Sequence, residues 1–228
     1  MTRAEIRRNV LLRLAEAPEE GREPLYLGEA IRMAADEVAV RTDCYLTYYT
    51  MDINGSPTEL EEFCLPGELY KIKAAKVTHS DDTVSILSPL RGEFVTRNWM
   101  DRHYYGWQDP AMETGNVRYL VLERPKALLY PFPAYDKTGG LVLYGYAKPG
   151  DAWTASAAAE TDECPLPEYA HTAVEIRAAI TRAIQFPTRE NLIRIPFLQD
   201  EYKAEIGRVA RLASQETADA SMYVGGGN

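Results

Sequence analysis

The chain contains few residues that commonly form covalent intermediates or bind metals. Its 228 residues include three histidines and three cysteines, Cys44, Cys64 and Cys164. The cysteines are odd in number and widely spaced, which predicts reduced, buried thiols rather than a disulfide framework or a zinc site. The motifs of zinc proteases, serine hydrolases, phosphate-binding loops, dinucleotide-binding folds and thioredoxin-like redox sites are all missing. These absences predict a protein with no catalytic residues, no cofactor and no metal.

Positive charge and long apolar runs are scarce as well. The 25 lysines and arginines are outnumbered by 34 acidic residues, which gives a net charge of −9 at pH 7. Sequence-independent binding to nucleic acid needs clustered positive charge, so this balance argues against a nucleic-acid binder. No run approaches the ~20 apolar residues of a membrane span, and the charged N-terminus lacks the apolar core of a signal peptide. The sequence therefore predicts a protein made and kept in the cytosol.

Two helices are predicted at the N-terminal end of the chain. Thr2 and Glu5 have the spacing of a capping box at a helix start, and an apolar stripe continues to Ala17, before Pro18. A second stripe predicts a helix from Leu27 to about position 41. We expect these two helices to form an αα-hairpin.

The most regular helical pattern lies near the C-terminal end. An apolar stripe from Tyr169 to Ile184 predicts one long helix, with Glu175 off the stripe and in solvent. A last helix is predicted over positions 198–213, with Pro196 either starting it or kinking a longer helix that begins near Thr188. The end of the chain from Tyr223 is expected to be disordered. The apolar residues of the first stripe are Tyr169, Ala173, Ile176, Ile180 and Ile184.

Between these helical regions the sequence has the alternation and turn residues of β-strands. Positions 45–51 alternate as a strand, and Asn54-Gly55 predicts a turn into a partner strand over 59–65. A third strand is predicted over 69–77. Further along, we expect a short helix within positions 90–105 and another strand over 117–123.

A β-hairpin is predicted at positions 127–149. Two apolar, aromatic-rich runs flank a polar segment from Tyr135 to Gly140, and each run ends at a proline that cannot extend a ladder. The hairpin follows a turn at Arg124-Pro-Lys126. Tyrosines at Tyr45, Tyr48, Tyr49, Tyr144 and Tyr146 are interpreted as half-buried sheet positions.

Two histidines have a chemical and a structural interpretation. His79 precedes Asp81 and Asp82, and such a group could hold a divalent cation, but the same residues between two strands are ordinary turn chemistry. His171 is predicted to be a solvated helix residue rather than a general base, because no nucleophile is placed beside it. The structural interpretation is favoured for both.

The segment from Trp99 to Asp109 places aromatic side chains beside charges. Such a cluster can form a glycan-binding platform, and two acids can run hydrolysis, but a linear cluster does not fix the carboxylate separation which that chemistry needs. Aromatic residues are enriched at protein interfaces, so an oligomer contact, a partner contact or a local core is favoured over catalysis. The candidate contact residues are Trp99, His103, Tyr104, Tyr105 and Trp107.

The predicted elements and three sequence segments together resemble the head-to-tail adaptor proteins of tailed bacteriophages. The segments are Leu-Leu-Tyr-Pro-Phe-Pro at 128–133, Leu-Val-Leu-Tyr-Gly-Tyr-Ala-Lys-Pro at 141–149, and Leu166-Pro167 before a long helix. The resemblance covers nearly the full chain and is strongest to adaptors, also called tail tubular or head completion proteins, that combine a helical bundle with an inserted β domain. The segment 99–112 and the glycine-rich end are not matched by any motif of these proteins.

This resemblance implies a non-enzymatic protein of the virion neck, synthesised in the host cytoplasm. Such adaptors form twelvefold rings beneath the portal protein, extend the DNA channel, and bind a stopper, nozzle or tail-tube protein. An acidic channel wall would let DNA slide without binding, and heterologous contacts between copies close a ring by rotation. A tail-terminator or stopper protein is one alternative, and a carbohydrate-active module using the Trp99–Asp109 loop is another.

The predicted fold is therefore of the α+β class, with a β-rich domain inserted into a discontinuous helical bundle. The bundle is predicted over residues 1–43 and 165–214, the β domain over 44–164, and a flexible arm over 215–228. Met222, Tyr223 and Val224 form an apolar island in this arm, which would order on binding a groove. By similarity to adaptors, we expect the arm to bind the portal.

Overall fold

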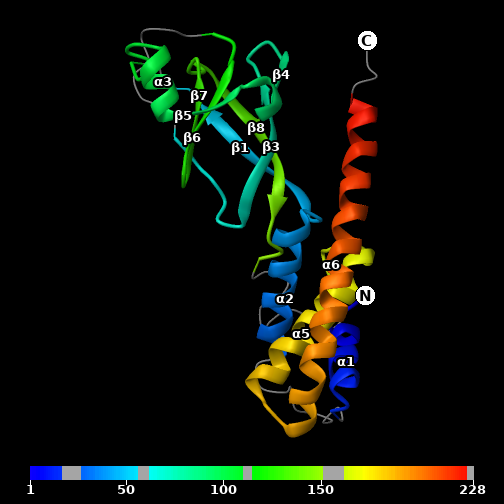
Figure 1. Cartoon of the computed structure of the whole chain (residues 1–228). Coiled ribbons are helices and arrows are strands. Elements are labelled where there is room, and N and C mark those ends of the chain that lie inside the picture. The colour runs from blue at the N-terminus through cyan, green and yellow to red at the C-terminus, as the bar shows by residue number, and fades with distance from the viewer. Residues whose placement is uncertain (17–26, 56–61, 110–114, 151–161, 225–228) are drawn as a thin grey trace. The chain divides into compact units, whose positions relative to one another are not determined.

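The computed structural model describes residues 1–16, 27–55, 62–109, 115–150 and 162–224 (Figure 1). The chain divides into two compact units. The helical unit comprises Met1–Tyr45 and Ala147–Asn228, and the β unit is the continuous segment Leu46–Tyr146. The predicted α+β class is confirmed. The segment that begins at Ala147 belongs to the helical unit, whereas the sequence predicted that the β domain continues to position 164.

Four α-helices and a short 3-10 helix form the described part of the helical unit. The predicted capping box is present, because the Thr2 hydroxyl accepts from the Glu5 amide and the Glu5 carboxylate accepts from the Thr2 amide. The first helix ends at Ala15, which has a left-handed backbone, and the predicted stop at Pro18 lies outside the described residues. The elements are α1 (Arg3–Leu14), α2 (Leu27–Thr42), η2 (Glu168–Ala170), α5 (His171–Gln185) and α6 (Arg189–Val224).

Helix α5 is the centre of the helical unit, because α1, α2 and α6 all pack mainly against it. Its small and branched residues, among them Ile176, Ala179 and Ala183, are fully buried. The predicted αα-hairpin is therefore wrong, since α1 and α2 contact α5 far more than each other. Because α1, α2 and α6 surround α5, more of its surface is buried than the single apolar stripe predicted.

The exposure of three residues of α5 differs from what the sequence predicted. His171 is only 4% exposed and Glu175 only 5%, although both were expected in solvent. Glu175 tolerates burial because the Asn9 amide donates to its carboxylate at 2.6 Å and Arg13 pairs with it at 3.5 Å. Ile184, predicted on the buried stripe, is 57% exposed at the last turn of the helix.

The β unit contains two four-stranded sheets. Sheet 1 has the strand order β1-β8-β3-β4, and sheet 2 has the order β2-β7-β6-β5. The strands are β1 (Leu46–Asn54), β2 (Phe63–Cys64), β3 (Leu69–Thr78), β4 (Val84–Leu87), β5 (Phe94–Thr96), β6 (Tyr119–Glu123), β7 (Lys126–Tyr130) and β8 (Asp136–Ala147). A 3-10 turn, η1 (Pro89–Arg91), and helix α3 (Arg97–His103) lie between β4 and β6.

The predicted strands mostly exist, but two predicted pairings are wrong. β1 pairs with β8 and not with the segment that follows Asn54-Gly55, whose strand β2 belongs to sheet 2. The hairpin predicted over 127–149 is also absent, because β7 pairs with β6 while β8 pairs with β1 and begins at Asp136. The helix expected within 90–105 is confirmed only over Arg97–His103.

The apolar face of sheet 1 is formed by alternate residues of its strands, including the buried Ile53, Val77, Leu141 and Leu143. Gly145 in β8 lies against β3, and a Cβ atom on it would be 2.4 Å from the Lys71 carbonyl oxygen. This close approach explains why a glycine separates the two tyrosines of the Tyr-Gly-Tyr segment.

Among the described residues, the helices are too short or too polar to cross a membrane.

Candidate functional site

The predicted aromatic cluster is a real spatial cluster, and its centre is packed as a core. Trp107 is only 3% exposed, and its indole N–H donates to the Asp101 carboxylate at 2.8 Å. Its ring packs on Tyr130 and Phe132 at centroid distances of 6.3 and 6.4 Å. Trp107 therefore stabilises sheet 2 and α3 and does not offer a contact surface.

The other aromatic residues of the cluster surround this core. Trp99 stacks on His103 with ring centroids 4.3 Å apart, and the Tyr104 hydroxyl lies 3.1 Å from that of Tyr119. Tyr105 is 99% exposed and His103 is exposed, so these two side chains are accessible to a partner. The arrangement favours the local-core interpretation, with an exposed margin at Tyr105.

A cavity of about 500 Å³ lies beside this loop, lined by Asp101 and residues 104–109. Asp101 is already the acceptor for the Trp107 indole and, at 3.4 Å, for the Gln108 amide. The one tryptophan of the lining is buried edge-on in the core rather than presented as a flat platform. These contacts weaken the carbohydrate-active alternative.

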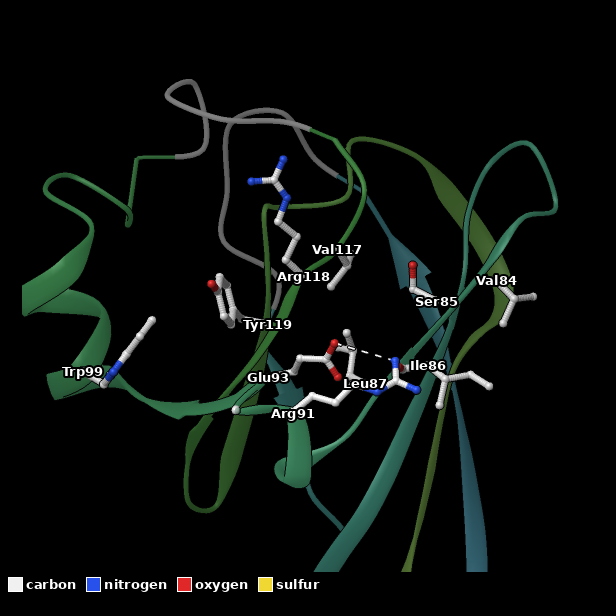
Figure 2. A pocket seen from close by; sticks show the side chains of 11 residues that line it. Val84, Ser85, Ile86, Leu87, Arg91, Glu93, Trp99, Val117, Arg118 and Tyr119 are labelled. Carbon is white, nitrogen blue, oxygen red and sulfur yellow. Dashed lines mark hydrogen bonds and ion pairs between the residues drawn. The ribbon is translucent and has the colours of Figure 1, made fainter. Parts of the chain in front are cut away.

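A second hollow of about 510 Å³, which we name the β4 groove, lies between the two sheets of the β unit (Figure 2). Val84 and Ile86 of β4 form one side, and Trp99 with Tyr119 forms the other (Figure 2). Sequence reasoning missed this groove because its walls come from four separate segments of the chain. Its lining consists of residues 84–87, 91–93, 99 and 117–119.

Charged side chains between the walls of the β4 groove bind the backbone of β4. The Glu93 carboxylate accepts the Ser88 amide at 2.7 Å, and Arg91 donates to the Ile86 carbonyl at 3.4 Å. Arg91 and Glu93 also face each other at 4.0 Å. The groove is thus mixed in polarity, with half-exposed aliphatic residues beside an ion pair.

The His79 group is a structured turn. His79 is 3% exposed, with Nε2 2.7 Å from the Ser85 hydroxyl and Nδ1 3.1 Å from that of Tyr135. Hydrogen bonds from Thr83 lower the pKa of Asp81 below its ordinary value. Burial raises the pKa of Tyr135. Within the described residues, no three histidine, cysteine or acidic side chains gather to hold a metal.

The buried polar groups of the helical unit also have structural partners. His171 lies with Nε2 2.8 Å from the Leu166 carbonyl oxygen. Burial raises the pKa of the Cys44 thiol, and it raises that of Cys164 to about 11, so both remain protonated. Cys64 is exposed, which contradicts the prediction that all three thiols are buried.

Glu37 joins three helices, which the sequence did not predict. Its carboxylate accepts from Arg177 of α5 at 2.5 Å and from the Tyr202 hydroxyl of α6 at 3.2 Å. Arg41, one turn along α2, pairs with it at 3.0 Å. Burial, with the negative charge of Glu37, raises the pKa of Tyr202, so its hydroxyl remains a donor.

Helix α6 is far longer than the other helices of the unit. Its 36 residues span about 54 Å, against about 22 Å for the 15 residues of α5. Among the residues of α6 whose burial the structure describes, Ala213 is the last one in the core, and the helical backbone continues to Val224. The sequence predicted a flexible arm from position 215, whereas Met222, Tyr223 and Val224 lie in the last turn of this helix.

Residues 1–224 match the protein family described as SU10 adaptor protein. The chain belongs to this family. The match confirms the predicted resemblance and shows that the protein is a structural head-to-tail adaptor.

The chain is also similar to a solved structure of a particle neck. The structure titled "Neck of empty GTA particle computed with C6 symmetry" covers 82% of this chain and 79% of its own, at 16% identity and a TM-score of 0.27. No curated protein matches the chain.

Proposed function

We propose that copies of this adaptor form a closed, twelvefold ring between the portal and the tail of a virion. The observation that carries this proposal is the family match over residues 1–224. The ring binds the portal on one side and a stopper, nozzle or tail-tube protein on the other, and it has no enzymatic activity. The accessible Tyr105 and His103 are candidate contacts within the ring or to the tail.

The end of α6 is the proposed portal contact. The helical backbone of α6 continues beyond Ala213 to Val224. A helix that inserts its end into a groove on another protein is a common mode of recognition. Met222, Tyr223 and Val224 are the proposed contact residues.

The charge of the protein suits a DNA channel. With a net charge of −9, a ring of many copies carries a large negative charge. Such a wall repels phosphates, so DNA passes without sequence-specific binding. A tail-terminator or stopper role is disfavoured by the adaptor family match.

The test is retention of the protein on heads that carry the portal but lack this adaptor. We expect the full chain to co-sediment with these heads and to appear as a ring by cryo-microscopy. A variant lacking residues 215–228 should lose retention while its melting temperature falls only slightly, because the core through Ala213 is kept and the exposed hydrogen bond from Tyr169 to Glu216 is lost. Failure of the full chain to bind would contradict the adaptor ring. Full retention of the truncated variant would move the portal contact to another surface.

A further inference from the structure

Among the described residues, sheet 1 ends on both sides in a strand that pairs with another strand on one side only. In the order β1-β8-β3-β4, the outer strands are β1, with nine residues, and β4, with four. Free strand edges pair readily with other chains, and proteins usually shorten, charge or cover them. A nine-residue edge strand is therefore a strong candidate for an interface.

The register shows which residues of β1 direct their backbone to the free edge. The Ala147 amide donates to the Tyr45 carbonyl at 3.1 Å, and Leu46 lies opposite Tyr146. In an antiparallel ladder the bonded positions alternate, so odd-numbered residues bond to β8. Leu46 and Tyr48 therefore point their N–H and C=O groups away from the sheet, and no described residue pairs with these groups.

The same reasoning applies to β4. The His79 amide donates to the Thr83 carbonyl at 2.8 Å, and β3 and β4 continue in that register. Odd-numbered residues thus bond to β3, and Val84 and Ile86 direct their backbone groups outward. The Ile86 carbonyl is covered by Arg91, but its N–H has no partner among the described residues.

Both edges expose apolar side chains on the same face of sheet 1. Leu46 is 49% exposed and Tyr48 66%, while Val84 is 48% exposed and Ile86 47%. All four lie on the face opposite the core, since odd-numbered neighbours such as Ile53 and Leu87 are buried. Exposed apolar residues on both free edges of one sheet are therefore complementary to each other.

We propose that β1 of one copy pairs with β4 of the next copy, so that sheet 1 continues from one copy to its neighbour. Leu46 and Tyr48 would then lie beside Val84 and Ile86, and pairs of aromatic and β-branched residues stabilise neighbouring strands. The β4 groove supplies the space beside β4 for the incoming strand. The contact joins two different edges, so it is heterologous, as ring closure requires. The inference rests on the proposed ring.

Proline tests the backbone of this contact directly. Ile86→Pro and Tyr48→Pro each remove an N–H that faces the free edge, without removing a bond to β3 or β8. Both variants should keep the wild-type melting temperature within a few degrees but lose ring formation on portal-bearing heads. Ile86→Val and Tyr48→Phe keep the N–H and are the matched controls that should form rings.

Disulfide trapping identifies the partner edge even if a proline variant folds poorly. In a Cys64→Ser background, Tyr48→Cys and Ile86→Cys are mixed on the heads and oxidised, and Tyr48→Cys with Val84→Cys tests the adjacent register. Cross-strand Cα distances suit a disulfide, so a covalent dimer should form in the mixture and in neither variant alone.

The trapping experiment distinguishes a contact between β1 and β4 from a contact between two like edges. Dimers in a single-variant sample would show that like edges meet and would overturn the proposal. Rings that form without any cross-link, and that tolerate both prolines, would overturn the strand contact and leave the adaptor ring in place. Absence of the wild-type protein from the heads would overturn the adaptor ring and the strand contact together.

Discussion

At the scale of single residues, three glutamates connect helices that are distant in the sequence. Glu37 joins α2 to α5 and α6 through Arg177 and Tyr202. Glu175 joins α5 to α1 through Asn9 and Arg13. Glu16, which follows α1, accepts from Arg182 of α5 and from Asn191 of α6, at 3.4 and 3.2 Å. Glu175 is the buried one of the three, and a buried carboxylate needs donors on the neighbouring helix, so its contacts constrain which faces of α5 and α1 meet.

The first prediction compares two glutamates that share Arg13. Glu175→Ala should lower the free energy of unfolding by about 2 kcal/mol, because the half-buried Asn9 amide on α1 loses the buried carboxylate that accepts its hydrogen bond. Glu201→Ala removes the other partner of Arg13. The Glu201 side chain is 49% exposed, so this substitution should cost less than about 0.5 kcal/mol of unfolding free energy. Urea unfolding followed by circular dichroism measures both, and equal effects would contradict the role of burial.

The second prediction concerns the thiols. Burial keeps Cys44 and Cys164 protonated and inaccessible, whereas Cys64 is exposed. A thiol reagent such as Ellman's reagent at pH 8 should therefore titrate one cysteine in the native protein and all three in denaturant. Cys64→Ser should abolish the native reaction. Rapid reaction of more than one native thiol would mean that the core around Cys164 opens readily.

At the scale of elements, helices were predicted well and strand partners poorly. The capping box at Thr2 and the stripe that begins at Leu27 are local signals, and both gave the correct helix. Strand partners depend on residues far along the chain. The runs around Leu129 and Leu143 looked like one hairpin, yet they belong to different sheets. Alternation indicates a strand but does not identify its neighbour.

The aromatic cluster shows the same limit for the candidate site. The sequence predicted that residues 99–107 gather, and they do, but it did not show which rings face inward. Trp107 is buried because Tyr130 of β7 and Phe132, which follows that strand, pack on it, and both lie more than twenty positions away. The β4 groove was not predicted at all, since it exists only once β4 and α3 are placed together.

The third prediction uses two isoleucines of α5 that the sequence placed on one stripe. Ile180 is 3% exposed and Ile184 57%. Ile180→Asp buries an unpaired charge between helices and should cost about 4 kcal/mol, while Ile184→Asp should cost less than about 0.5 kcal/mol. Thermal unfolding monitored by circular dichroism distinguishes them. An unchanged melting temperature for Ile180→Asp would remove this residue from the core.

At the scale of the whole molecule, the β unit is one continuous insertion. The chain leaves the helical unit after Tyr45 and returns at Ala147, and these two residues are joined by a backbone hydrogen bond of 3.1 Å. The two crossing points are therefore adjacent, although the whole segment Leu46–Tyr146 lies between them in the sequence. Because the two ends of the inserted β unit lie close together, the helical unit can accommodate the insertion without a change in its own fold.

The fourth prediction follows from these adjacent ends. Replacing residues 46–146 with a short glycine-serine linker should leave a helical unit that folds by itself, because its core residues all lie outside the insertion. We expect a helical circular dichroism spectrum and a cooperative thermal transition. A non-cooperative transition would show that the helical unit requires the β unit, and the Ile180→Asp change in the shortened chain serves as the unfolded control.

The central position of α5 also imposes an order on synthesis. Helices α1 and α2 leave the ribosome long before the helix that buries them, and the Glu37–Arg177 contact spans 140 positions. The β unit is complete before α5 is translated, so it can fold first, while α1 and α2 keep an unburied apolar face. The finished bundle thus appears only at the end of translation, which delays assembly until each copy is whole.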